Sequence, residues 1–328
     1  MTSRSILFLG GTGIISSAAS ALAAERGYDV TLLNRGTNAL RQPAEGVEVL
    51  IGDAHDPDSL DRALGDRTFD AVAQFLAFTP DQVAPDIARF EGRTGQYVFI
   101  SSASAYQKPP ARLPITESTP LRNPFWQYSR DKIACEDLLV AAYRERGFPV
   151  TIVRPSHTYD RTTIPLVGDW TAVDRMLRGL PVVVQGDGSS LWALTHTRDF
   201  AKAFVGLLDN PLALGEAFHI THDAVVTWDQ VAHWLADAAG VEADIVHVAS
   251  DTIAAASDDL GPGLVGDKAH SVIFDNSKVK TLVPDFVATI PFAEGAREMV
   301  EWHLANPEHA KVDPVLDALF DDLIAKSR

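Results

Sequence analysis

A glycine turn near the N-terminus, set between a short apolar segment and a helical one, most constrains the fold of this chain. Residues 5–9 (SILFL) predict a buried strand, residues 10–13 (GGTG) a turn and residues 14–26 a helix. Glycines permit a tight turn and let backbone N–H groups approach a phosphate, and the helix N-terminus adds its positive dipole end. In this context the turn predicts a βαβ unit that binds a dinucleotide.

Strand-like and helical segments alternate through the first half of the chain. Short apolar runs separated by helices indicate parallel strands that are joined by crossover helices. The further strands expected are 28–33, 47–51, 69–75, 96–101 and 149–154, and the helices are 57–64, 81–91 and 127–146. We therefore predict an α/β fold with a doubly wound parallel sheet of the Rossmann type.

The second half of the chain has shorter, mixed elements. The expected strands are 181–184 and 191–195, and the expected helices are 171–178, 197–208, 227–239, 291–305 and 312–326. Because no clear linker separates the halves, we expect them to interleave. Residues 1–155 are predicted to form the dinucleotide-binding domain, completed by parts of 181–222, and residues 156–328 mostly a smaller substrate-binding cap.

The net charge of the chain argues against two classes of binding partner. The chain has 28 Lys and Arg against 44 Asp and Glu, a net charge of −16, which disfavours nucleic acid and anionic membranes as partners. No run reaches the roughly 18 apolar residues of a membrane-spanning helix, and no signal-peptide pattern is present. The single Cys135 excludes an internal disulfide and a cysteine-based zinc site. We expect a cytoplasmic protein without a metal site.

The residues after the second strand bear on which dinucleotide is bound. A carboxylate at this place accepts a hydrogen bond from the ribose of NAD, but this chain has Asn34 and Arg35 there. A guanidinium can pair with a 2′-phosphate, so the sequence favours NADP and leaves NAD open. Asp53 fits a turn cap as well as a contact to adenine. Ser16 replaces the third glycine of the fingerprint, which predicts a slightly shifted helix with binding retained.

Tyr128 and Lys132 are the candidate acid/base pair. They stand four residues apart on the expected helix 127–146 and therefore share one face. A phenol with a pKa of about 10 is a poor base near neutral pH, and lowering it by about 3 units takes roughly 4 kcal/mol, which a nearby ammonium can contribute. Ser102, at the end of strand 96–101, can hydrogen-bond the reacting oxygen. The proline-rich stretch 102–126 between them predicts a functional loop.

These features occur together with RP at 154–155, GDG at 186–188, TRD at 197–199 and DNSK at 275–278. Over most of its length the chain thereby resembles the extended short-chain dehydrogenase/reductase family, in its NAD-dependent epimerase/dehydratase branch. The resemblance implies that Tyr128 is the acid/base, that Lys132 holds the nicotinamide ribose and that Ser102 polarises the substrate oxygen. The predicted dinucleotide contacts are Gly10, Thr12, Gly13, Ile14, Ile15, Asn34, Arg35, Asp53, Ala54, Leu76, Ala77, Tyr128, Lys132, Pro155 and His157.

Departures from the family pattern reduce the number of reactions that this chain is expected to catalyse. In the 4,6-dehydratases of this family an Asp-Glu pair follows the Ser or Thr, whereas here Ala103 and Ser104 follow Ser102. Members that epimerise beside a ketone carry a cysteine where this chain has Ser104. The sequence therefore favours a reaction that needs only hydride transfer and one proton, which is a reductase, a dehydrogenase or a 4-epimerase.

Other departures concern the substrate. Nucleotide-sugar enzymes of the branch carry an Asn soon after the Arg-Pro strand end and an Arg after the GDG turn. This chain has His157 within the first segment and Trp192 in the second place. An indole cannot neutralise a diphosphate but can stack on a sugar ring, which argues against a standard nucleotide-diphosphate sugar. The predicted substrate contacts are Ser102, Ser104, His157 and Trp192; for His157 and Trp192 a structural role fits equally well.

The leading hypothesis is an NAD(P)-dependent oxidoreductase that acts on a secondary alcohol or ketone of a sugar or polyol. The alternative is a sugar 4-epimerase with tightly bound NAD. A dinucleotide sensor without turnover is disfavoured because Tyr128 and Lys132 are both present, and an RNA-binding role, known for plastid relatives of the family, is disfavoured by the net charge. An apolar stripe on helix 127–146 is compatible with a homodimer or with internal packing.

Overall fold

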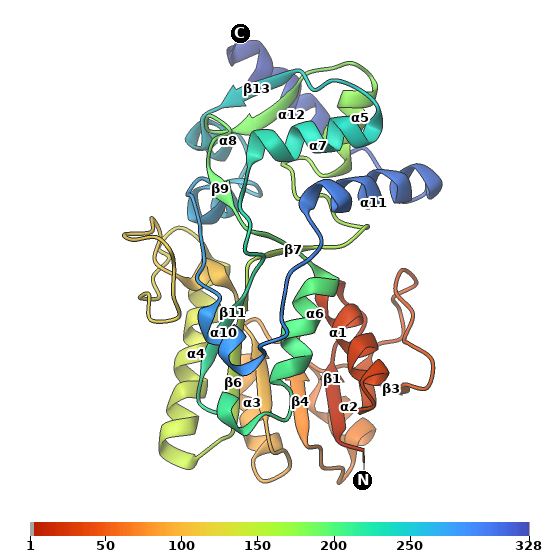
Figure 1. The fold of residues 1–328 in the computed structure, drawn as a ribbon, viewed down its shortest axis with the longest axis vertical. Helices are drawn as coiled ribbons and strands as arrows, with labels where there is room; N and C mark the ends of the chain where they lie inside the picture. The colour runs from red at the N-terminus through yellow and green to blue at the C-terminus, as the bar shows by residue number, and fades with distance from the viewer. Residues whose placement is uncertain (1–2, 328) are drawn as a thin grey trace.

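The structure is a computed structural model that describes residues 3–327, and its centre is a seven-stranded parallel sheet (Figure 1). The strands are β1 (Ser5–Leu9), β2 (Asp29–Asn34), β3 (Glu48–Ile51), β4 (Ala71–Gln74), β5 (Tyr97–Ile100), β6 (Val150–Pro155) and β11 (Ala217–Ile220). They lie in the order β11-β6-β5-β4-β1-β2-β3. The order reverses between β1 and β4, and such a switch point places a ligand crevice at the carboxyl ends of the strands.

Helices cover both faces of this sheet because successive side chains of each strand point to opposite sides. Ile6 and Phe8 belong to the core under α1 (Ile14–Glu25) and α6 (Thr197–Leu207). Leu7 and Leu9 belong to the core on the other face. The helices of that face are α2 (Pro57–Leu64), α3 (Pro80–Phe90) and α4 (Gln127–Arg146). The predicted doubly wound α/β fold is confirmed.

The second half of the chain contributes to this sheet. β11 pairs in parallel with β6, with Ala217 opposite Ile152, and α6 packs beside α1 on one face. The short helices η2 (Pro211–Ala213) and α10 (Ser277–Leu282) lie in the same part of the molecule (Figure 1). Segments far apart in the sequence therefore build one layered unit.

The remaining elements lie beyond the carboxyl ends of the sheet strands, in the upper part of Figure 1. Their strands are β7 (His157–Tyr159), β8 (Val182–Gln185), β9 (Leu191–Trp192), β10 (Leu194–His196), β12 (Val226–Thr227) and β13 (Ile245–Val248). They pair as β10-β7, β12-β9 and β13-β8. The helices are α5 (Trp170–Leu177), α7 (Trp228–Ala239), α8 (Ser250–Ala256), α9 (Gly261–Gly263), α11 (Phe292–Ala305) and α12 (Pro314–Ser327), and residues Leu264–Lys268 form a π-helical turn, η3.

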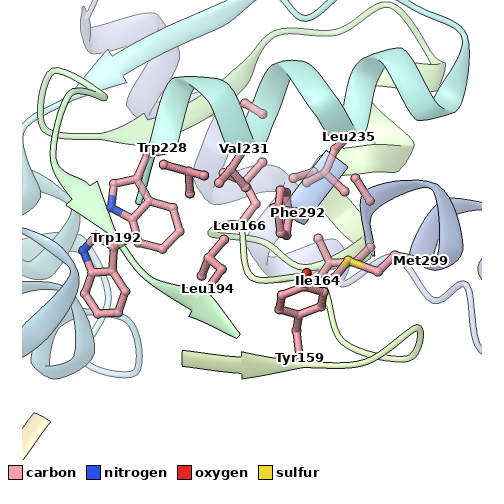
Figure 2. Packing of buried hydrophobic residues seen from close by; sticks show 14 of the residues in the cluster. Tyr159, Ile164, Leu166, Trp192, Leu194, Trp228, Val231, Leu235, Phe292 and Met299 are labelled. Atoms are coloured by element: carbon pink, nitrogen blue, oxygen red, sulfur yellow. The ribbon is translucent and has the colours of Figure 1, made fainter. Parts of the chain in front are cut away.

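Aromatic side chains form the core of this upper part. Trp192 packs on Trp228, the first residue of α7, with ring centroids 5.3 Å apart. Both rings belong to one core with the apolar residues of this helix (Figure 2). Thr227 and Gln230 start α7 with reciprocal side-chain to backbone hydrogen bonds of 3.1 and 2.9 Å, which satisfy two N–H groups at this end. The cap of α7 thus fixes the position of the Trp228 ring against which Trp192 lies.

The proline-rich stretch 102–126 holds one short 3-10 helix, η1 (Ala103–Ala105), and is anchored by isolated bridges from Tyr106 to Leu121 and from Ile115 to Phe274. Within residues 3–327, no helix has the length and apolar character that a bilayer crossing requires. The same residues contain no group of three or more His, Cys, Asp or Glu placed to hold a metal ion.

Candidate active site

The glycine turn between β1 and α1 is closed by a serine. Gly10 has a φ of +90°, and a side chain there would place its Cβ 2.6 Å from Cγ of Leu76, so only glycine fits. The Ser16 hydroxyl accepts a hydrogen bond from Gly13 N–H at 2.8 Å and donates one to the Gly10 carbonyl at 2.5 Å. The residue that replaces the third glycine therefore holds the turn together through hydrogen bonds.

A cleft of about 240 Å³ opens beside this turn at the switch point of the sheet. Of the predicted dinucleotide contacts, it is lined by Gly10, Thr12, Gly13, Asn34, Arg35, Asp53, Ala54 and Leu76. Ile14 and Ile15 form the first turn of α1 instead. The Ala77 carbonyl points to Lys132 rather than to the cleft, accepting a hydrogen bond from its ammonium.

The far end of the cleft suits the adenosine half of a dinucleotide. Arg35 is exposed and its guanidinium has no partner among residues 3–327, so it is free to pair with a phosphate. Asp53 accepts a hydrogen bond from His55 N–H at 2.9 Å, so it caps a turn and lines the cleft as well. His55, which no sequence motif marks, reaches the Leu76 carbonyl with Nε2 at 2.9 Å. The crowded glycine turn and the free guanidinium fit a bound dinucleotide.

The loop after β2 is tied down at two places. Asn38 donates from Nδ2 to the Thr12 carbonyl at 2.6 Å. Arg41 donates two hydrogen bonds to Asp160, at 2.8 and 3.1 Å, and contacts Thr162. Burial raises the pKa of Asp160, but the hydrogen bonds from Arg41 and Thr162 outweigh it and bring that pKa below its usual range. This pair links the loop that lines the cleft to the residue after β7.

We expect Arg41→Ala to weaken dinucleotide binding by roughly tenfold, because the loop loses the charge-assisted hydrogen bonds that hold it over the cleft. Fluorescence titration of the purified protein with NADPH and NADH measures the dissociation constants. Arg178→Ala is a suitable control, since Arg178 pairs with Asp174 and Asp317 on a different surface. An unchanged affinity in Arg41→Ala would show that the pair does not support the cleft.

Lys132 is held by backbone carbonyls at the ends of two sheet strands. It is 1% exposed, and its Nζ donates to the carbonyl of Ala77 at 2.7 Å and to that of Ile100 at 2.8 Å. The ammonium lies 5.8 Å from the centroid of the Tyr128 ring and 4.6 Å from that of Phe78. Burial lowers the pKa of Lys132 to about 8, so the group is still cationic at neutral pH.

Tyr128 follows its helix start at Trp126 and faces the hydroxyl of Ser102. Burial raises the pKa of Tyr128, and the hydrogen bond with Ser102 only partly offsets this. Burial is the largest of these effects and the Asp267 charge adds to it, so the pKa of Tyr128 lies above its usual value. Ser102 is held in turn by Ser104, whose hydroxyl lies 2.8 Å from that of Ser102 and accepts a hydrogen bond from Ser129 at 2.8 Å.

A second cavity, of about 290 Å³, joins the catalytic candidates to the upper part of the molecule. Of the predicted residues it is lined by Ser102, Ser104, Tyr128, Pro155, His157 and Trp192. Trp126 and Phe274 also line it and were not predicted, and Asp267 and Lys268 line it as well. Asp267 and Lys268 come from η3, far from Tyr128 in the sequence, so no local motif marks them. Burial and the Lys268 charge lower the pKa of His157 to about 3, which keeps its ring neutral.

Glu136 on α4 and Arg154 on β6 form a buried ion pair. Arg154 donates to both carboxylate oxygens of Glu136, at 2.9 and 2.5 Å, and the two side chains are 6% and 3% exposed. Ser101 donates to the same carboxylate at 2.5 Å. Glu136 stands one helical turn after Lys132, so the pair attaches this part of α4 to the end of β6.

A comparison of the sequence with models of protein families shows the family to which this chain belongs. A model of the NAD dependent epimerase/dehydratase family matches residues 6–91 and 86–221, which together cover more than half of the chain. The chain belongs to this family. The residues of this chain that match the family model include the glycine turn, Ser102, Tyr128, Lys132 and residues from all seven strands of the central sheet.

Individual relatives agree with this membership. The chain is 29% identical over 257 residues to the chloroplast stem-loop binding protein of 41 kDa b of Arabidopsis thaliana, which covers 74% of this chain and 66% of that protein. It is 26% identical over 288 residues to 2′-dehydrokanamycin reductase of Streptomyces kanamyceticus, covering 86% of this chain and 79% of the reductase. The structure of dTDP-glucose 4,6-dehydratase of Bacillus anthracis in complex with NAD has the same fold, with a TM-score of 0.73, 20% identity and coverage of 93% and 98%.

Proposed function

We propose that this member of the epimerase/dehydratase family is an NAD(P)-dependent oxidoreductase that moves a hydride to or from a secondary alcohol or ketone of a sugar- or polyol-like molecule. The observation that carries the proposal is that Ser102 and Tyr128 line one cavity while Lys132 lies beside the Tyr128 ring. One relative is named as a reductase, which supports this reaction class. Residues 1–155 with α6 and β11 would bind the dinucleotide, and most of 156–328 would cap the substrate.

A bound nicotinamide supplies or accepts the hydride, and this chain's residues handle the proton. In the reductive direction Ser102 donates a hydrogen bond to the carbonyl oxygen of the substrate, and the Tyr128 hydroxyl gives its proton to that oxygen as the alcohol forms. The nearby Lys132 ammonium stabilises the phenolate that remains, and Lys132 would also hold the nicotinamide ribose. In the oxidative direction the proton returns from the alcohol to Tyr128. Trp126 and Trp192 supply apolar surface to the wall of the cavity.

For the cofactor we propose NADP, on the strength of Arg35. Arg35→Ala should raise the dissociation constant of NADPH by about tenfold or more, because a charge-assisted pair with the 2′-phosphate is lost. The dissociation constant of NADH should change little, since its ribose carries no phosphate. Parallel fluorescence titrations of the variant and the parent protein measure both. Equal losses for the two dinucleotides would rule out a phosphate contact at Arg35.

The 4-epimerase alternative needs the same Ser102, Tyr128 and Lys132, and the Arg41–Asp160 pair, which ties the loop after β2 to the residue after β7, fits a retained cofactor. Denaturing the purified protein and identifying any released nucleotide by mass separates the two functions. Stoichiometric NAD favours the epimerase and overturns the NADP assignment. A protein that is purified without a bound nucleotide and then binds NADPH favours a reductase or dehydrogenase. Binding of neither dinucleotide removes the basis of the proposal.

We propose no RNA-binding role, although one relative is named for binding a stem-loop. The net charge of −16 opposes contact with a phosphate backbone. A basic patch large enough for RNA would have to overcome this charge, and the free cation noted above, Arg35, stands at the dinucleotide cleft.

A further inference from the structure

The cavity beside Tyr128 contains one cation that the proposed hydride transfer does not use. Lys268 ends η3 and lines the cavity together with Asp267. The Asp267 carboxylate is already bound by Lys108, whose Nζ lies 2.6 Å from Oδ1 and which is itself 1% exposed. Lys108, Asp267 and Lys268 therefore leave one net positive charge at this cavity, in a chain whose overall charge is −16.

The Lys268 ammonium makes no hydrogen bond within residues 3–327. Burial lowers its pKa, and the charge of Asp267 only partly counters this. A partly buried cation without a hydrogen-bond acceptor carries a desolvation cost in a folded protein. A negatively charged ligand in the cavity would remove that cost, and the attraction is stronger here than in water because the local dielectric is low.

Two further donors at the same cavity lack acceptors. The indole Nε1 of Trp192 is buried and has no hydrogen-bond partner, whereas Nε1 of the adjacent Trp228 donates to the Lys268 carbonyl at 3.2 Å (Figure 2). The neutral His157 ring makes no hydrogen bond within the described residues and meets Trp192 edge-on, with centroids 6.3 Å apart. The Trp192 nitrogen is closed off from solvent, so of these two groups only the His157 ring is placed to donate to a ligand in the cavity, and the matching ligand offers an acceptor.

We propose that Lys268, together with the His157 ring that lines the same cavity, binds an anionic group of the substrate, a carboxylate or a phosphate. The inference rests on the proposed function for the identity of the reacting carbon. Tyr128 and Lys268 line one cavity of about 290 Å³, so a single ring or short polyol that carries its own acid group can reach both. We therefore expect the substrate to be an acidic sugar or polyol.

Protection of Lys268 from chemical modification tests this directly. The full chain is methylated reductively with isotope-labelled formaldehyde at constant ionic strength, and each lysine is quantified by peptide mass spectrometry. Glucuronate, glucose 6-phosphate and inorganic phosphate are the anionic probes, and glucose is the neutral control. We expect at least one anion to slow the labelling of Lys268 several-fold, with glucose without effect. Lys311, which lines the neighbouring cavity, serves as the internal reference. No protection by any of the three anions, or equal protection by glucose, overturns the inference.

The pattern of protection also identifies the acid group, because glucuronate carries a carboxylate and glucose 6-phosphate a phosphate. Calorimetry with the protecting probe then compares variants. Lys268→Gln should raise the dissociation constant at least about tenfold, as expected for a lost hydrogen bond to a charged group, and Lys268→Arg should largely restore it. Lys311→Gln should leave it unchanged, and an equal effect of Lys311→Gln would point to general charge attraction and refute a specific site.

A further variant distinguishes a failure of the anion-binding inference from a failure of the proposed function. Tyr128→Phe should bind the anionic probe as tightly as the parent protein, because Lys268 is intact. Anion binding at Lys268 in a protein without hydride transfer would leave the inference standing and the proposed function refuted. Hydride transfer to neutral sugars without any effect of Lys268→Gln would do the reverse.

Discussion

Replacing Tyr128 by phenylalanine should lower kcat/KM by roughly 10²–10⁴-fold, the usual contribution of one positioned acid/base group. Only the hydroxyl is lost, and the ring keeps its packing against Trp126, with centroids 4.9 Å apart. Dinucleotide binding should stay close to that of the parent protein, because the cleft between the glycine turn and His55 does not include Tyr128. Turnover is followed by nicotinamide absorbance on the ketone or alcohol that the parent protein accepts.

The matched control for this variant is Tyr143→Phe, since Tyr143 lies on the same helix and is 41% exposed. It should leave both turnover and binding unchanged. If Tyr128→Phe retained the activity of the parent protein, the assignment of the proton-transfer group would be wrong. If dinucleotide binding fell together with turnover, the Tyr128 hydroxyl would have to be regarded as a contact to the dinucleotide or as a structural group.

Truncating Glu136 to alanine should destabilise the fold by about 3–5 kcal/mol, because it leaves the Arg154 guanidinium buried without a counter-charge. The pair has two hydrogen bonds, and Ser101 would lose its acceptor as well. Urea unfolding followed by circular dichroism gives the free energy of unfolding of the variant and the parent protein.

Two comparisons make this measurement specific. The double variant Glu136→Leu with Arg154→Met should recover much of the loss, since replacing both members of a buried ion pair by apolar residues is often neutral. Glu91→Ala breaks the exposed Arg146–Glu91 pair, whose side chains are 46% and 43% exposed, and should cost at most about 1 kcal/mol. A loss in Glu136→Ala no larger than that of Glu91→Ala would show that the buried pair is dispensable.

The central sheet could be predicted because its signals are local. The strand 5–9 and the helices 57–64 and 127–146 end where the patterns place them, and strands β2 to β6 agree with the predictions within a few residues. The edge strand β11 was not predicted, because it joins the sheet only through its pairing with β6. Buried parallel strands are continuous apolar runs, and the helices have clear ends, such as Gly147 with a φ of +68° after α4.

The upper part of the molecule was predicted less well because its short elements depend on distant partners. The strand β13 consists of four residues that pair with β8, with Ile245 opposite Val182, and this contact cannot be read from the local sequence. The strand expected at 191–195 is divided into β9 and β10 at Ala193, whose carbonyl accepts a hydrogen bond from Ser156 at 2.8 Å.

The same distinction applies to the site. The glycine turn and the pair Tyr128 and Lys132 are short-range patterns, and the sequence marks them directly. His55 and Lys268 reach their cavities through tertiary contacts, so the sequence does not single them out. Burial cannot be judged from spacing either, and in this structure it raises the pKa of Tyr128.

The Arg41–Asp160 bridge has a consequence for how tightly each of the two ligands binds in the presence of the other. Arg41 belongs to the loop that lines the dinucleotide cleft, and Asp160 directly follows β7, whose first residue, His157, lines the other cavity. A ligand that fixes either side also fixes the bridge, so each ligand raises the affinity for the other by the same factor. Titration of the dinucleotide with and without the substrate, and of the substrate with and without the dinucleotide, should therefore show the same factor of mutual tightening, and Arg41→Ala should reduce both factors.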